Sequence, residues 1–200
     1  MKAVENSKIS SLQDIMDGAL SRREFVRGCA VGLSCVLAGS AVVLSPEEAQ
    51  AAKLPLTVFS TEQAETLGAL GDAIVPGALE GGVVHFIDKQ LQQNNTLLLI
   101  KYLGIETSQF EGFYKAGLNS ALSLCLRLYK KSPVSLSEEE AENWVTAMAA
   151  GGIADWSGPP SDFFFFVIKN DACDVTYGTP NGTESLGIPY MAHIVPTESW

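Results

Sequence analysis

The chain has 200 residues, of which 46% are hydrophobic and 18% charged, so it can bury the core of one ordinary domain. Its formal net charge of −10 argues against a nucleic-acid-binding protein, because such proteins normally present a basic face. The only histidines are His85 and His193, and there is no Cys-x-x-Cys motif. This composition argues against a structural zinc site, covalently bound haem and most histidine-based catalysis.

The amino-terminal quarter of the chain is typical of an export signal. Arg22 and Arg23 stand in a Ser-Arg-Arg-x-Phe sequence, with Phe25 two places after the pair. An uncharged stretch follows over residues 28–44, and its glycines and serines keep it only mildly apolar. Paired arginines before such a stretch predict a twin-arginine signal peptide.

A cleavage pattern closes this leader. Ala49 and Ala51 form the small-x-small sequence that signal peptidases recognise, which predicts a signal peptide over 1–51 and a mature domain over 52–200. The alternative is an uncleaved leader that serves as a single membrane anchor, because the uncharged stretch is close to the shortest that spans a bilayer.

The leader also bears on cofactors. The twin-arginine route carries folded proteins, commonly ones that receive a cofactor before export. The sequence contains neither a Gly-x-Gly-x-x-Gly motif nor a phosphate-binding Gly-Lys-Ser/Thr motif. We therefore expect a periplasmic protein whose partner, and not the chain itself, holds the cofactor.

The first half of the predicted mature domain indicates helices. A capping box of Ser60 and Gln63 begins a helix with apolar residues at helical intervals, which Pro76 ends. A second helix is predicted over 83–93, and a short apolar segment follows over 96–103.

The second half continues the helical pattern. Capping boxes of Ser108 with Glu111 and of Ser137 with Glu140 predict the starts of two further helices. A last helix is predicted to begin at Asp162 and to reach about Ala172. The residues beyond Cys173 are rich in proline, glycine and aromatics without a period, which indicates an extended segment. The predicted fold is all-α: a small helical bundle with an irregular C-terminal wrap.

Few residues suggest catalysis. His85 and Asp88 lie three positions apart on one predicted helix, so they face the same side, but no third metal ligand accompanies them. The acidic run Glu138–Glu140 is explained by its place at a helix start, where carboxylates suit the helix dipole. The sequence nominates no nucleophile, so no catalytic, cofactor-binding or metal-binding residue is predicted.

Four consecutive phenylalanines are the most unusual feature of the predicted domain. Their side chains point around most of a helix, so one side enters the core and the other meets the C-terminal wrap, a partner or water. The alternative is that the domain itself covers all four. The candidate partner interface comprises Trp156, Phe163, Phe164, Phe165, Phe166, Tyr177 and Trp200.

The two cysteines of the predicted mature domain leave two alternatives open. Cys125 and Cys173 are able to pair in an oxidising compartment. Cys125 also lies in an apolar helical stripe, where a buried free thiol is equally natural.

Several stretches, in this order, resemble the gluconate 2-dehydrogenase subunit 3 family. They are TEQAETLGALGDAIVP (61–76), GGVVHFID (81–88), DFF (162–164), YGTPNG (177–182) and LGIP (186–189). The closing segment departs from the family pattern, because Leu186 stands where a bulkier sequence with tryptophan is common.

This resemblance implies a small subunit without chemistry of its own. Its partner would be a large FAD-containing, GMC-type dehydrogenase that oxidises a sugar, sugar acid or glycoside, often with a cytochrome c subunit. The small subunit would support folding and export of the flavoprotein and reach the membrane through the complex. The competing readings are an enzyme in its own right and a stand-alone periplasmic helical module that binds quinone or another apolar ligand.

Overall fold

The computed structural model describes residues 33–37, 40–93 and 96–188. Its main elements are the helices α4 (Thr61–Ile74), α5 (Val83–Gln90), α6 (Phe110–Tyr129), α7 (Glu138–Ala150) and α8 (Ser161–Tyr177). Shorter helical turns are α3 (Pro46–Ala51), η2 (Leu99–Tyr102), η3 (Thr107–Gln109), η4 (Pro133–Ser135) and α9 (Pro180–Ser185). From residue 52 onward, the described part of the chain is helical with connecting segments, as the sequence predicts.

A hairpin precedes these helices. The strands β1 (Leu33–Leu37) and β2 (Ser40–Leu44) pair antiparallel, with Leu33 opposite Leu44. This hairpin lies within the predicted leader and outside the predicted domain. Arg22, Arg23 and Phe25, the twin-arginine residues, lie outside the described residues.

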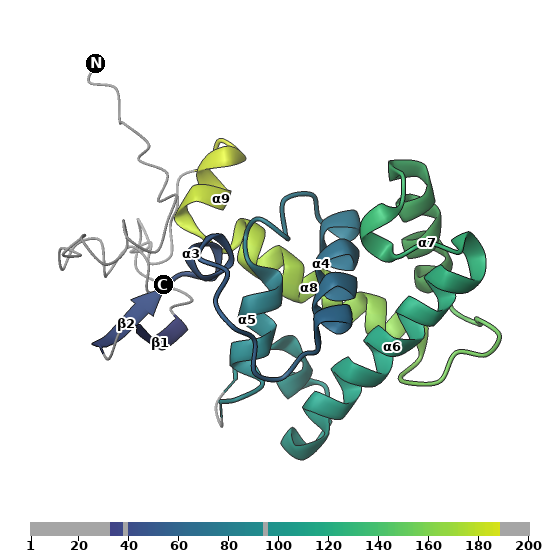
Figure 1. Ribbon diagram of the computed structural model, residues 1–200, viewed down its shortest axis with the longest axis horizontal. Coiled ribbons are helices and arrows are strands. Elements are labelled where there is room, and N and C mark those ends of the chain that lie inside the picture. Colours follow the sequence, from purple (N-terminus) through teal and green to yellow (C-terminus); the bar gives the residue numbers. More distant parts are fainter. Residues whose placement is uncertain (1–32, 38–39, 94–95, 189–200) are drawn as a thin grey trace, which may run out of the picture.

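Helix α8 is the central element of the bundle. It packs against α4, α5, α6 and α7, and Figure 1 shows it running through the middle of the bundle. Its approach to α6 depends on Gly117, because a Cβ at that position would overlap the ring of Phe164. The largest fully buried side chains come from several helices: Trp144, Tyr114, Phe86, Phe164, Leu67 and Leu70.

Two of the three predicted capping boxes are present. Ser60 and Gln63 cap α4 reciprocally, as do Ser137 and Glu140 at α7. The box predicted at Ser108 is wrong, because residues 107–109 form the turn η3 and α6 begins at Phe110 without a side-chain cap.

The C-terminal part is more helical than predicted. Helix α8 does not end at Ala172 but continues to Tyr177, since Val175 extends its buried face by one turn. The turn-rich segment after it contains α9, where Thr179 accepts a hydrogen bond from the Gly182 N–H and Pro180 takes the first position. Residues 189–200, including His193 and Trp200, lie outside the described residues.

Among the described residues, no helix has the length and hydrophobicity needed to cross a membrane.

Candidate functional site

The polar face of α5 holds the chain around the end of the predicted leader. His85 contacts this chain with both ring nitrogens: Nδ1 lies 2.9 Å from Gln50 Oε1, and Nε2 lies 3.0 Å from the Leu54 carbonyl oxygen. Both nitrogens of His85 are therefore engaged within the chain.

Asp88 continues this attachment one helical turn further along. Its carboxylate accepts hydrogen bonds from the backbone N–H groups of Thr57 (3.0 Å), Val58 (2.8 Å) and Phe59 (3.0 Å). Gln92 adds a bond from Nε2 to Thr57 Oγ1 at 3.2 Å. We call His85, Asp88 and Gln92 the clamp, because together they fix residues 50–59 to α5.

The clamp accounts for His85 and Asp88, the pair that the sequence analysis considered for metal binding or catalysis. His85 and Asp88 do face the same side of one helix, as predicted. Asp88 is only 3% exposed, and its oxygens are occupied by backbone donors. No group of three or more His, Cys, Asp or Glu side chains within the described residues is placed to hold a metal ion. The geometry is that of a structural attachment.

A buried hydrogen bond between Tyr114 and Asp171 connects α6 and α8 in the core. Tyr114 on α6 donates its hydroxyl to Asp171 Oδ2 at 2.5 Å, and the Leu99 N–H lies 3.4 Å from Asp171 Oδ1. Burial raises the pKa of Asp171 to about 7, although both hydrogen bonds oppose that shift. Burial likewise raises the pKa of Tyr114, with the nearby Asp171 carboxylate adding to the shift. The sequence analysis missed this pair, because nothing in the spacing of residues 114 and 171 places them together.

The four phenylalanines divide between the core and the surface. Phe164 is fully buried, which removes it from the candidate interface. Phe163 and Phe165 are half-buried, whereas Phe166 is 41% exposed and has the Lys169 ammonium 5.9 Å from its ring centroid. Phe166 is thus the member of the run most available to a partner.

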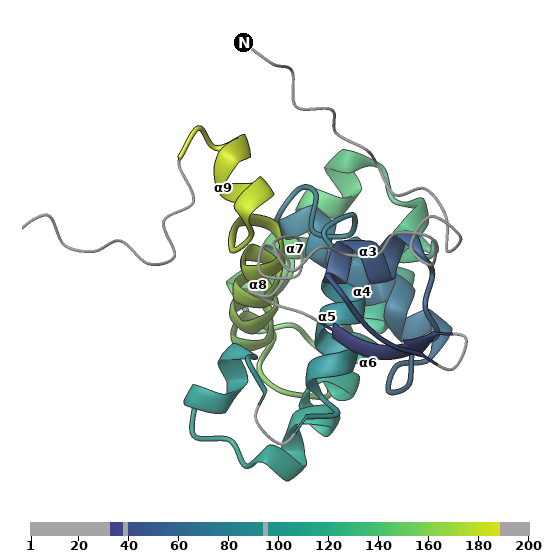
Figure 2. The same cartoon turned by 90° about the vertical axis from the view of Figure 1, so that its left-hand side faces the viewer.

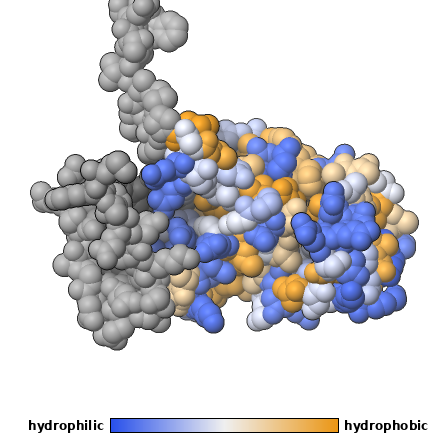
Figure 3. All heavy atoms as spheres, turned by 90° about the horizontal axis from the view of Figure 1, so that it is seen from above, coloured by the Kyte–Doolittle hydropathy of each residue, from blue (hydrophilic) through white to orange (hydrophobic). Residues whose placement is uncertain are grey.

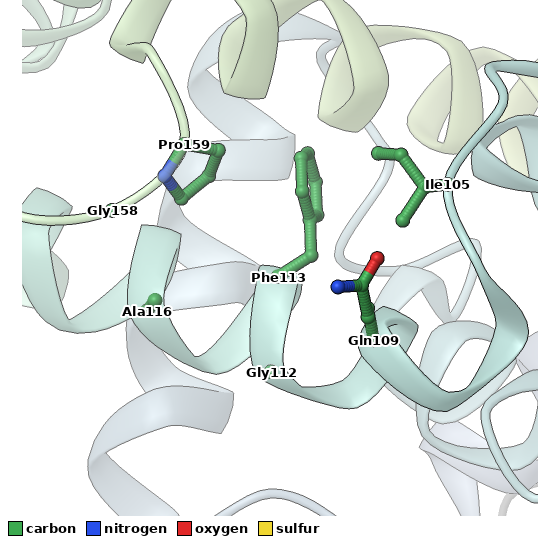
Figure 4. A pocket seen from close by; sticks show the side chains of 7 residues that line it. All are labelled: Ile105, Gln109, Gly112, Phe113, Ala116, Gly158 and Pro159. Carbon is green, nitrogen blue, oxygen red and sulfur yellow. The ribbon is translucent and has the colours of Figure 1, made fainter.

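A shallow apolar groove lies beside the amino-terminal half of α6. Its volume is about 490 Å³, and it is lined by Ile105, Gln109, Gly112, Phe113, Ala116, Gly158 and Pro159. Figure 4 shows the ring of Phe113 standing between Pro159 and Ile105. Phe163 packs edge-on against the Phe113 ring, with the ring centroids 5.7 Å apart. One candidate aromatic therefore adjoins the groove.

Two other interface candidates are partly covered. Trp156 donates its indole N–H to the Pro159 carbonyl at 2.6 Å, and it packs near Phe164 with ring centroids 6.4 Å apart. Tyr177 is half-buried at the end of α8. On the face seen from above in Figure 3, apolar and hydrophilic residues are interspersed.

The two cysteines of the predicted mature domain are not bonded to each other in the structure. Cys125 and Cys173 are both free, and the Cys125 thiol donates to the Lys131 carbonyl at 3.4 Å. Burial raises the pKa of Cys125 to about 11, with the Glu140 carboxylate contributing, so the group is an unreactive thiol. Of the two alternatives, the buried free thiol describes Cys125.

Comparison with known proteins identifies the family. The model of the gluconate 2-dehydrogenase subunit 3 family matches residues 61–193. The match includes all of α4 to α9, so the chain belongs to this family. Neither the curated proteins nor the solved structures include a significant match.

Proposed function

We propose that this chain is the non-catalytic small subunit of a periplasmic, FAD-dependent dehydrogenase complex that oxidises a sugar, sugar acid or glycoside. The family match over residues 61–193 carries the proposal, because the family is named for subunit 3 of gluconate 2-dehydrogenase. In this proposal the FAD belongs to a large GMC-type flavoprotein subunit, and a cytochrome c subunit completes some complexes. The small subunit supports folding and twin-arginine export of the flavoprotein.

The engagement of the polar side chains supports an accessory role. His85 and Asp88 are occupied by their hydrogen bonds to residues 50–59, and Asp171 is buried against Tyr114. An acid or base in catalysis must reach a proton of the substrate within hydrogen-bond distance. None of these groups meets that requirement in the chain alone.

The proposed surface for the flavoprotein combines the groove along α6 with the exposed aromatic residue of α8. The groove offers apolar side chains around Phe113, and Phe166 is a large exposed aromatic. Aromatic side chains at the centre of an interface commonly carry most of its binding energy.

Co-purification tests the proposed function. The chain, tagged at its carboxyl terminus, is produced in its native host and isolated from the periplasmic and membrane fractions. We expect a large subunit to accompany it, with the absorption bands of bound flavin in the complex. Recovery of the chain alone, with quinone bound or with sugar turnover of its own, would contradict the accessory role.

A further inference from the structure

The predicted cleavage site is folded onto the helical domain. Ala49 and Ala51, the two small residues of that site, belong to α3. Ser45 and Glu48 form a complete capping box at its start, and Ala49 is fully buried. The site is therefore helical and half covered, and not an extended exposed segment.

Helix α3 is seated closely on the start of α5. The two helices contact each other, and α3 lies on the side of the bundle that faces the viewer in Figure 2. Gly82 permits this approach in two ways: its φ of +86° is in the left-handed region, and a Cβ there would overlap the Pro46 carbonyl. The glycine at the start of α5 therefore suits the close packing of α3.

The clamp secures the chain on the other side of the cleavage site. His85 binds the side chain of Gln50, between the two small residues, and the carbonyl of Leu54 just after them. Asp88 then fixes the backbone of residues 57–59. The Ala51–Ala52 bond therefore lies between a packed helix and an anchored segment.

We propose that the clamp and α3 protect the Ala51–Ala52 bond in the folded chain, so that the leader remains attached to the exported subunit. Peptidases cut folded proteins through locally opened states, and here opening requires loss of the Pro46–Gly82 packing and of the Gln50–His85 contact. The inference rests on the proposed twin-arginine export, because only a folded passenger meets the peptidase with α3 already packed.

The test in cells is the amino terminus of the subunit in the assembled complex. Intact mass and amino-terminal sequencing are applied to wild type and to the Gly82→Ala variant. We expect wild type to lack a chain beginning at Ala52 and the variant to contain one, because release of α3 exposes the Ala51–Ala52 amide to hydrolysis by the peptidase. Wild-type subunit beginning at Ala52 in the intact complex would overturn the proposal.

A matched variant separates protection from general weakening of the fold. Gly152 has a similar φ of +67°, but a Cβ there meets no atom within 4 Å. Gly152→Ala thus adds comparable backbone strain far from the clamp, and we expect no chain beginning at Ala52. Equal cleavage of the two variants would overturn the proposal.

A second assay tests the protection of the Ala51–Ala52 bond without requiring export. The purified full-length chain is treated with elastase, which cuts after small residues, and the cut after Ala51 is quantified by mass spectrometry. We expect about tenfold slower cutting at this bond in wild type than in His85→Ala. Equal rates would overturn the protection itself, whereas failure of export in cells with protection intact would instead contradict the proposed function.

Discussion

Asp171 shows how a single buried carboxyl group links the stability of this fold to pH. Desolvation raises its pKa from 3.8 to about 7, so the folded chain keeps the proton over a range in which the unfolded chain loses it. Well below pH 3.8 the group is protonated in both states, and its stabilising contribution is fully present. That contribution is lost as pH rises through the folded pKa near 7.

The corresponding prediction concerns Asp171→Asn. The neutral amide keeps an acceptor for Tyr114 but does not titrate, so the variant should lose much of the decline in unfolding free energy between pH 4.5 and 7.5. The lost dependence over this range should amount to about 3 kcal/mol, because most of the shift of roughly three pKa units falls between these two pH values. Urea unfolding across this range measures it. Parallel pH profiles of wild type and variant would contradict the assigned pKa.

The clamp gives a second prediction at this scale. Asp88→Ala removes the acceptor of three backbone N–H groups, so the unfolding free energy should fall by about 3 kcal/mol. Glu65→Ala is the control, because Glu65 is an exposed residue within the regular helix α4. The control should change stability by less than about 0.5 kcal/mol. Similar losses in both variants would show that Asp88 does not anchor the segment.

Local spacing predicted the shared face of His85 and Asp88 but not their partners. Positions three apart on a helix face the same side whatever they bind, so their spacing does not indicate the backbone at residues 54–59 as their partner. The Tyr114–Asp171 bond was equally out of reach, because the two residues are 57 positions apart. Contacts of this kind follow from tertiary packing, which single-sequence periodicity does not record.

At the scale of the element, the phenylalanines of α8 divide between one that stabilises the fold and one proposed to bind the partner. Phe164→Ala empties a site in the core between α6 and α8 and should cost about 3–5 kcal/mol of unfolding free energy. Phe166→Ala should leave the thermal midpoint nearly unchanged but weaken the proposed complex by about 2 kcal/mol or more. Thermal unfolding and affinity for the flavoprotein distinguish the two. Wild-type affinity of Phe166→Ala would place the interface elsewhere.

The helices themselves were largely predictable, and their ends were not. Capping boxes at Ser60 and Ser137 combine a cap with an apolar period, and both predictions are confirmed. The same pattern at Ser108 failed because a 3₁₀ turn occupies residues 107–109. Helix α9 was missed because its Pro-Asn-Gly sequence is also typical of a turn, and packing against the end of α8 decides between the two.

At the scale of the whole molecule, export couples this chain to its proposed partner. Replacing Arg22 and Arg23 with lysine keeps the charge but removes the planar guanidinium groups. The precursor should remain in the cytoplasm, together with the flavin activity of a partner that lacks a signal of its own. Fractionation followed by a dye-linked dehydrogenase assay measures both. Unchanged periplasmic activity would contradict shared export.

The accessory role predicts that no polar residue of this chain is catalytic in the assembled complex. His85, Asp88 and His193 are the strictest tests, because histidine titrates near neutrality and the first two share a helix face. Each alanine variant should keep turnover per bound flavin within a few-fold of wild type, whereas loss of a general acid or base costs roughly 10²–10⁴-fold. Activity per cell is expected to fall for Asp88→Ala, because the weakened clamp lowers the amount of assembled complex. Normalising the rate to flavin absorbance removes that effect. A hundredfold drop at full flavin occupancy, with the complex intact, would instead make this subunit a direct contributor to the active site.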